Sequence, residues 1–266
     1  MTNSVIVMES SSNLRALGRD ALKDKWMEAV LVVMIFCVLT EIPVIILDSV
    51  FGGSMFDTVT NGYNPAYGGY TDVSDAGGYS MVSSIYLLVV SGPLTYGISL
   101  FFLNLFRNSG TEISTIMVGF EKFGKTFLLA LYMSVFIFLW ALLFLIPGVI
   151  AAIKYSQSFF ILADNPEMSI PEIVNESKRL MAGNKGKYFC YNLSFIGWII
   201  LAAIPAGTIG ALAAVYINSY FVTQICTFIG GVGLFWVFAY LRSTGVAFYQ
   251  ILTGRLRADT YDPGEY

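Results

Sequence analysis

The chain of 266 residues contains no histidine, the side chain that enzymes use most often for proton transfer near neutral pH. This absence excludes Ser–His triads and removes a common ligand of zinc and haem. Cys37, Cys190 and Cys226 lie in apolar stretches without CxxC spacing, which indicates buried, reduced thiols rather than a disulfide or metal site. We therefore expect a protein that is not an enzyme and that holds no metal and no cofactor.

Charged residues are also scarce: they form 12% of the chain, whereas hydrophobic residues form 56% and the mean hydropathy is +0.69. Apolar runs of about 20 residues recur, the length that a helix needs to cross a hydrocarbon core of about 30 Å. These runs are too long and continuous for the strands of a transmembrane barrel. The sequence predicts an all-α protein, a polytopic transmembrane helical bundle with about six crossings, in a single integral membrane domain over residues 1–266.

Basic residues are absent between Lys25 and Arg107. The positive-inside rule therefore places the intervening Gly/Tyr-rich loop, residues 51–83, outside the cell. By the same rule, the N-terminus and the C-terminus are both expected in the cytoplasm.

Periodicity and apolar length divide the chain into helices. Amphipathic helices are predicted on the cytoplasmic surface at residues 13–25, 110–122 and 169–183. The predicted crossings lie at residues 26–50, 84–106, 126–146, 148–163, 188–206 and 222–242, followed by a cytoplasmic tail at residues 243–266.

Residues 126–163 could form one crossing or two. A single helix over this stretch would be roughly 57 Å long, nearly twice the hydrocarbon thickness. Basic clusters on both sides of the stretch must lie inside, which requires an even number of crossings. Because proline interrupts a helix and glycine accepts turn conformations, Pro147 and Gly148 predict the tip of a hairpin of two crossings.

The residues after the fifth crossing allow more than one interpretation. Small residues recur at four-residue intervals and suggest that its helix continues past a kink at Pro205: Ala202, Ala206, Gly210 and Ala214. Residues 207–225 could instead hold a re-entrant segment or a seventh crossing. A seventh crossing would place the C-terminal arginines outside, so six crossings are preferred.

Glu41 and Lys154 lie inside predicted crossings and define a candidate intramembrane polar site. At about 1.5 Å per residue, Lys154 lies about 9 Å from the outer boundary and Glu41 about 22 Å from the inner one. These depths agree, and an unpaired charge in lipid is costly, so we hypothesise an ion pair that Tyr155, Gln157 and Ser158 extend. In the alternative, Lys154 reaches the outer headgroups, and Glu41 is protonated or reaches water.

A second candidate site is a set of basic residues at the cytoplasmic face. Their number is sufficient for contact with anionic lipid headgroups, although membrane topology alone also explains them. The set contains Arg15, Arg19, Lys23, Lys178, Arg179, Lys185 and Lys187. No nucleic-acid partner is expected, because these groups lie at a membrane surface and form no recognition motif.

Four segments carry a resemblance to a known family: NLRALGRDALKDKWMEAVLV, LIPGVIAAIKYSQSFFILADNPEMSIPEIVNESKRLMAGNKGKYF, LSFIGWII and AYLRSTGVAFYQIL. Together they resemble the bacterial polytopic membrane proteins grouped as domain of unknown function 975. The resemblance implies a multi-pass protein of the bacterial plasma membrane, without an established activity. The central segment also looks like the membrane domain of some glycerophosphodiester phosphodiesterases, although no phosphodiesterase domain is present.

These patterns support two hypotheses of function. The first is a non-enzymatic role in lipid binding or membrane assembly, with membrane lipids or another membrane protein as partner. The alternative is a small transporter or exporter component, in which Glu41, Lys154 and Gln157 line a polar cavity.

Overall fold

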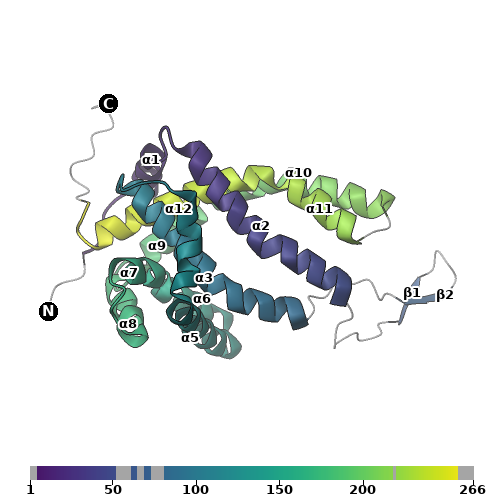
Figure 1. Ribbon diagram of the computed structural model, residues 1–266, viewed down its shortest axis with the longest axis horizontal. Helices are drawn as coiled ribbons and strands as arrows, with labels where there is room; N and C mark the ends of the chain where they lie inside the picture. The colour runs from purple at the N-terminus through teal and green to yellow at the C-terminus, as the bar shows by residue number, and fades with distance from the viewer. Residues whose placement is uncertain (1–4, 52–60, 65–68, 73–80, 218–219, 257–266) are drawn as a thin grey trace.

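The computed structural model describes residues 5–51, 61–64, 69–72, 81–217 and 220–256, and most of them are helical (Figure 1). The first half contains α1 Ser11–Ala21, α2 Trp26–Phe51, α3 Met81–Phe106, the 3-10 helix η1 Ile113–Met117, α4 Val118–Glu121 and α5 Phe123–Leu143. The second half contains α6 Leu145–Tyr155, α7 Ser158–Asp164, α8 Ile170–Leu180, α9 Lys185–Leu193, α10 Ile196–Tyr216, α11 Tyr220–Gly230 and α12 Val232–Leu252. The predicted all-α class is confirmed.

A short antiparallel hairpin lies inside the stretch that the sequence predicts to be a loop. Strand β1 Asn61–Asn64 pairs with β2 Gly69–Asp72, and Asn61 lies opposite Asp72. Residues 52–60, 65–68 and 73–80 of the predicted loop lie outside the described residues, whereas its two ends belong to α2 and α3.

Six helical stretches are long and apolar enough to cross a membrane, which agrees with the predicted number. They are Trp26–Asp48, Met81–Phe106, Phe123–Leu143, Leu145–Asp164, Lys185–Tyr216 and Val232–Leu252. The fifth continues past Pro205, as the small residues suggested.

The last stretch begins later than the predicted 222–242, because α11 is a separate apolar helix. Helix α11 ends at Gly230, and α12 begins directly after Gly231. A Cβ added at Gly230 would lie 2.8 Å from the Ala206 Cα, so glycine lets α11 pack closely on α10. Within residues 207–225, the described residues thus belong mainly to α10 and α11, which pack against each other.

The segment after α3 is less regular than the predicted surface helix at residues 110–122. It forms η1 and the single turn α4, which follow the surface of α3 closely. A Cβ at Gly97 would lie 2.6 Å from the Ile116 carbonyl carbon, so the backbones of α3 and η1 touch. Contact with α3, rather than an amphipathic periodicity, determines the path of this segment.

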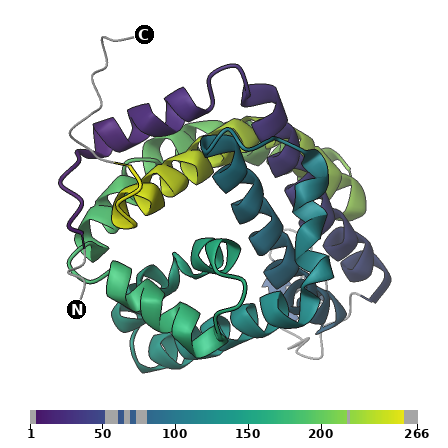
Figure 2. The same ribbon diagram turned by 60° about the vertical axis from the view of Figure 1, so that its left-hand side comes forward.

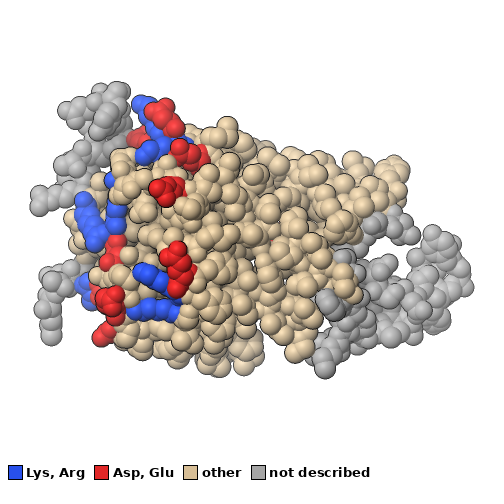
Figure 3. All heavy atoms as spheres, in the orientation of Figure 1, with Lys and Arg blue, Asp and Glu red and all other residues tan. Residues whose placement is uncertain are grey.

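On the face shown in Figure 3, the charged side chains gather at one end of the molecule. The rest of the described surface on this face consists of uncharged residues. We define the charged end as the part of the molecule formed by α1, α8, the start of α9 and the segments that follow α3 and α12 (Figure 1). Because charged groups are costly in hydrocarbon, this end faces water and the apolar belt beside it faces lipid.

Helix α1 packs along α12 at the charged end (Figures 1 and 2). A Cβ added at Gly18 would lie 2.8 Å from both N and Cα of Thr244, so only glycine allows this approach. The Ser243 hydroxyl donates a buried hydrogen bond to the Gly18 carbonyl oxygen at 2.8 Å. The segments around these residues, near the two ends of the chain, therefore form one packed unit.

The residues that precede α1 are held by one buried amide. Asn184 lies between α8 and α9, and its Oδ1 accepts a hydrogen bond from the Val7 N–H at 2.8 Å. Its Nδ2 donates to the carbonyl oxygens of Val5 at 2.8 Å and Leu180 at 3.0 Å. Asn184 thus ties the start of the described chain to the turn after α8.

Candidate functional site

The last residue of α7, Asp164, joins three distant parts of the chain at the charged end. Arg107, which follows α3, donates from Nη1 to Oδ1 at 2.7 Å and from Nη2 to Oδ2 at 3.0 Å. The hydroxyl of Tyr249 on α12 donates to Oδ2 at 2.8 Å, and Arg255 Nη1 donates to the same oxygen at 2.6 Å. We refer to Asp164, Arg107, Tyr249 and Arg255 as the Asp164 cluster.

Burial makes this cluster a structural clamp. The Asp164 side chain is 5% exposed, compared with 27% for Arg107 and 50% for Arg255. Charge-assisted and bidentate hydrogen bonds replace the water that the carboxylate loses. The rings of Phe160 and Tyr249 stack nearby at 5.3 Å between centroids. The cluster therefore fixes the ends of α3, α7 and α12 relative to one another.

The Asp164 cluster is not evident from the sequence. The positive-inside rule accounts for both arginines by topology alone, and no motif marks Asp164. Arg107 and Arg255 are 57 and 91 residues from Asp164, so no local spacing shows that they meet. The available signal was an acidic residue directly at the end of an apolar run, which is a poor position for an unpaired charge.

The structure does not bring Glu41 and Lys154 together. Glu41 is exposed on α2, whereas Lys154 is half-buried near the end of α6. Neither residue forms an ion pair within the described part of the chain. The Lys154 carbonyl oxygen instead accepts a hydrogen bond from Ser177 Oγ on α8 at 2.8 Å. The depth estimate placed the two residues at similar depths, but α6 packs mainly on α5, α8 and α9, whereas α2 packs mainly on α3, α11 and α12.

The other predicted site residues lie at this turn. Tyr155 is buried, and Lys178 Nζ on α8 lies 5.6 Å from its ring centroid, within cation–π range. Gln157 is fully buried, and its Nε2 donates to Ser156 Oγ at 2.8 Å. Its Oε1 and the Ser158 hydroxyl are buried without a partner among the described residues. Lys154 and Tyr155 thus meet α8, while Glu41 stays apart.

The predicted headgroup-contacting residues lie on elements of the charged end. Arg15 and Arg19 are on α1, Lys23 follows it, Lys178 and Arg179 are on α8, and Lys185 and Lys187 are on α9. The Arg179–Glu176 pair is the one ion pair that involves this set in the described residues, with Nη2 and Oε1 2.5 Å apart. Hydrogen bonding to Glu176 raises the pKa of Arg179.

The apolar faces of the two amphipathic helices contact protein, not membrane. On α1, Leu14 and Leu17 are buried, and the helix packs on α12. On α8, Ile173 and Val174 are buried, and the helix packs on α6 and α7. The expectation that residues 13–25 lie on the membrane surface is therefore refined: this helix covers the protein, and only its polar face is available to lipid headgroups.

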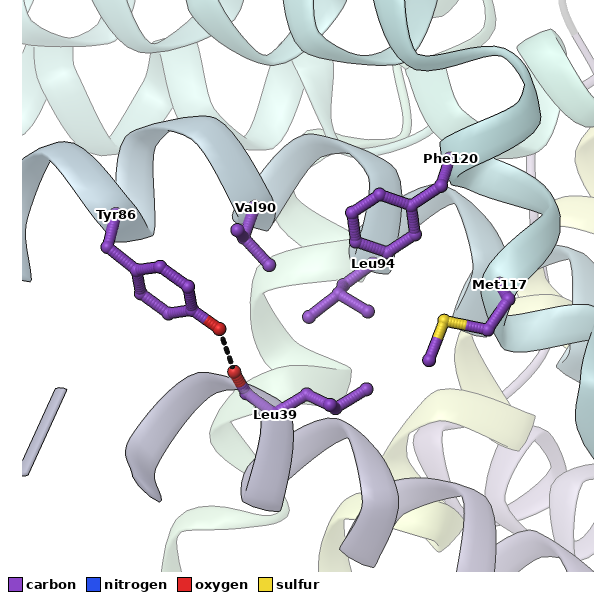
Figure 4. Close-up of a pocket in the computed structure, with 6 residues that line it drawn as sticks. All are labelled: Leu39, Tyr86, Val90, Leu94, Met117 and Phe120. Atoms are coloured by element: carbon purple, nitrogen blue, oxygen red, sulfur yellow. Dashed lines mark hydrogen bonds between the residues drawn. The ribbon is translucent and has the colours of Figure 1, made fainter. Parts of the chain in front are cut away.

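Two apolar grooves open on the surface. One, of about 300 Å³, lies between α2, α3 and the η1–α4 segment, where the Tyr86 hydroxyl donates to the Leu39 carbonyl oxygen at 2.6 Å (Figure 4). The other, of about 420 Å³, lies between α5 and the first turn of α8, and we term it the α5–α8 groove. Its lining consists of Leu128, Leu131, Tyr132, Val135, Phe136, Ile170 and Pro171.

Six long apolar helical stretches with charged side chains gathered at one end define a multi-pass helical membrane protein. The model of the family described as "Protein of unknown function (DUF975)" matches residues 8–153 and 142–256, so the chain belongs to this family. No curated protein and no solved structure matches the chain. The distant resemblance to the membrane domain of glycerophosphodiester phosphodiesterases therefore stays a prediction.

Proposed function

We propose that the protein is a non-enzymatic protein of the bacterial plasma membrane that binds anionic phospholipid at its charged end. One observation carries this proposal: helix α8 borders an apolar groove at its start and bears basic side chains at its end. An acyl chain fits the lining of the α5–α8 groove, and a phosphate headgroup fits Lys178 and the basic side chains of α9. The charged end faces the cytoplasm in this proposal, because basic residues are retained on that side.

Several basic side chains are available for such contacts. In the described part of the chain, ion pairs involve only Arg107, Arg179 and Arg255. Lys178, Lys185 and Lys187 therefore keep their charge without a carboxylate within 4.0 Å in those residues. Each basic residue near an anionic surface contributes about 1 kcal/mol to attraction, so three together favour anionic over zwitterionic lipid strongly.

The alternative role as a transporter or exporter component requires a polar cavity. The two grooves described above are lined almost wholly by apolar side chains, and Glu41 lies apart from Lys154. These observations favour lipid binding over transport. A role in membrane assembly would use the same surfaces to hold a second protein, and the experiment below distinguishes the two.

Native mass spectrometry tests the proposal on the protein in mild detergent with added phosphatidylglycerol or phosphatidylcholine. We expect phosphatidylglycerol to remain bound and phosphatidylcholine to dissociate. The triple variant K178Q, K185Q and K187Q should lower the phosphatidylglycerol-bound fraction at least fivefold. The charge-conserving control K178R, K185R and K187R should keep it.

Two results would contradict lipid binding. One is equal retention of the two lipids, and the other is unchanged phosphatidylglycerol binding in the glutamine variant. A stoichiometric membrane-protein subunit that remains bound without any lipid would support the assembly role instead.

A further inference from the structure

Helices α5 and α6 are joined at Phe144 and form a hairpin, which we term the α5–α6 hairpin. Helix α8 lies at the boundary between this hairpin and water. Its outward side carries Glu172 and Arg179, both exposed, and charged side chains of this kind stay at or above the lipid headgroups. The same helix contacts both arms of the hairpin. Ile170 and Pro171 share the α5–α8 groove with α5, and Ser177 donates its hydrogen bond to the Lys154 carbonyl oxygen on α6. Both arms of the hairpin are therefore held at the level of the charged end.

The distance from this level to the tip of the hairpin is short. Leu145, the first residue of α6, precedes Lys154 by nine residues, which is about 14 Å of helix. On the other arm, the α5 residues that line the groove, Leu128 to Phe136, precede the last residue of α5, Leu143, by fifteen to seven residues, or about 22 to 11 Å. A hydrocarbon core is about 30 Å thick, so a helix that crosses it needs about 20 residues. We infer that the α5–α6 hairpin does not cross the membrane, but enters the leaflet at the charged end and stops near the bilayer centre.

The arrangement of the helices agrees with a shallow insertion. In Figure 1, α2 and α3 run across the picture, whereas α5 and α6 run mainly along the line of sight. The turned view of Figure 2 shows α5 lengthwise along the lower edge. The hairpin is thus inclined to α2 and α3, and the depth of its tip along their direction does not exceed the length of helix between α8 and the tip.

The side chains of the tip are apolar, as expected for a segment that stays among acyl chains. No charged or amide side chain occurs between Ser134 and Lys154, and the tip residues Phe144 and Leu145 are 69% and 76% exposed. A tip beyond the opposite headgroups would place these side chains against water. The partner of this surface is therefore the acyl layer of the leaflet at the charged end.

The turn itself leaves few amide hydrogens without partners. Phe144 is the only residue between the two helices, and its N–H donates to the Trp140 carbonyl oxygen at 3.1 Å. Pro147 has no N–H, and the Gly148 N–H donates to the Phe144 carbonyl oxygen at 3.3 Å. Only Leu145 and Ile146 keep amide hydrogens that α6 cannot pair, which limits the free-energy cost of a dry turn.

The depth of Trp140 tests this inference directly. The variant W26F, W198F and W236F leaves Trp140 as the one tryptophan, 46% exposed and close to the tip. In vesicles of phosphatidylcholine and phosphatidylglycerol, lipids brominated at different acyl positions quench fluorescence according to depth. We expect the strongest quenching from bromines near the chain ends, because the inferred tip lies near the bilayer centre.

A hairpin of two full crossings predicts a different result. Trp140 would then lie seventeen residues from Phe123, about 25 Å deep and thus about 5 Å from the opposite headgroups. Bromines close to the headgroups would quench it most, and that outcome would overturn the inference. The variant W140F, W198F and W236F, which keeps Trp26 at the start of α2, serves as the shallow control.

Accessibility of the tip gives a second measurement. With Cys37, Cys190 and Cys226 replaced by alanine, Leu145→Cys should resist a membrane-impermeant maleimide in intact cells and in inverted vesicles. Thr71→Cys, in the hairpin between α2 and α3, should react in one of the two preparations, and Glu112→Cys should react in the other. Reaction of Leu145→Cys on the same side as Thr71→Cys would show a full crossing. Phospholipid binding in the mass spectrometry experiment does not depend on this result.

Discussion

Arg107 and Asp164 are 57 residues apart in the sequence, yet two parallel hydrogen bonds, of 2.7 and 3.0 Å, join the guanidinium to the carboxylate. This bidentate contact connects the end of α3 to the end of α7 at the charged end. Because Tyr249 and Arg255 bind the same carboxylate, three helices and the C-terminal turn depend on one acidic side chain. A change there should affect the whole charged end.

Asp164→Asn should destabilise the protein by about 3–5 kcal/mol, the usual effect of removing one partner of a buried ion pair. The amide keeps the size of the side chain but leaves two guanidinium groups without their counter-charge. Thermal unfolding in detergent, followed by tryptophan fluorescence, should show a clearly lower Tm. Glu112→Gln, at an exposed position without an ion pair in the described residues, is the control and should leave Tm unchanged. Equal Tm values for the two variants would contradict the clamp.

The two arginines of the cluster should differ in importance. Arg107 is bidentate and mostly buried, whereas Arg255 makes one hydrogen bond and is half exposed. Arg107→Gln should therefore lower stability more than Arg255→Gln, whose effect should stay below about 1 kcal/mol because exposed ion pairs are weak. Denaturation curves of the two variants, measured side by side, check this order. A larger loss in Arg255→Gln would show that the C-terminal turn holds the cluster.

Gly18→Ala should separate α1 from α12. The added methyl group would approach the backbone of Thr244, which cannot move as a flexible side chain can. Overpacking of this kind costs about 1–3 kcal/mol. Gly186→Ala on α9 is the matched control, since a Cβ there meets nothing within 4 Å and alanine favours the helix. Hydrogen exchange of the α1 amides should accelerate in the first variant only, and equal protection in both would show that this close approach is dispensable.

Local patterns predicted the helices well. Apolar length identified the long helices, and the amphipathic helix predicted at residues 169–183 agrees with α8, which begins at Ile170. Such signals depend on residues three or four positions apart, and one sequence contains them in full. The breaks within helices were harder to predict, because the bends at Ser156 and Gly231 depend on what packs against them.

Contacts between distant segments could not be predicted in this way. The proposed Glu41–Lys154 pair came from counting residues along straight helices perpendicular to the membrane. In the structure, α6 packs mainly on α5, α8 and α9 while α2 packs mainly on α3, α11 and α12, so similar depths do not bring the two side chains together. The Asp164 cluster was not predicted, because the positive-inside rule accounts for Arg107 and Arg255 without assigning a partner to either.

The capping box of α8 should give this helix a dependence on pH. The Ser169 side chain and its N–H both hydrogen-bond to Glu172, with Glu172 Oε2 2.8 Å from the Ser169 nitrogen. These bonds lower the pKa of Glu172. A carboxyl with a lowered pKa stabilises the folded form above its unfolded pKa, and this contribution disappears as the pH falls through the folded value. Exchange protection of the first turn of α8 should therefore decline at acidic pH in the wild type. The decline should be absent in Glu172→Gln, and a decline of equal size in that variant would assign it to another group.

Asn184→Leu should release the segment that precedes α1. Leucine has a similar size but offers no acceptor to the Val7 N–H and no donor to the Val5 carbonyl oxygen. The buried N–H of Val7 would lose its partner, and such a loss costs about 1–3 kcal/mol. Limited proteolysis should then cleave near residues 5–9 several-fold faster, while the Tm of the helical bundle changes less. Asn175→Leu, at an exposed position on α8, should leave the cleavage rate unchanged. If both variants were cleaved at the wild-type rate, packing of Val7 alone would be sufficient to hold this segment.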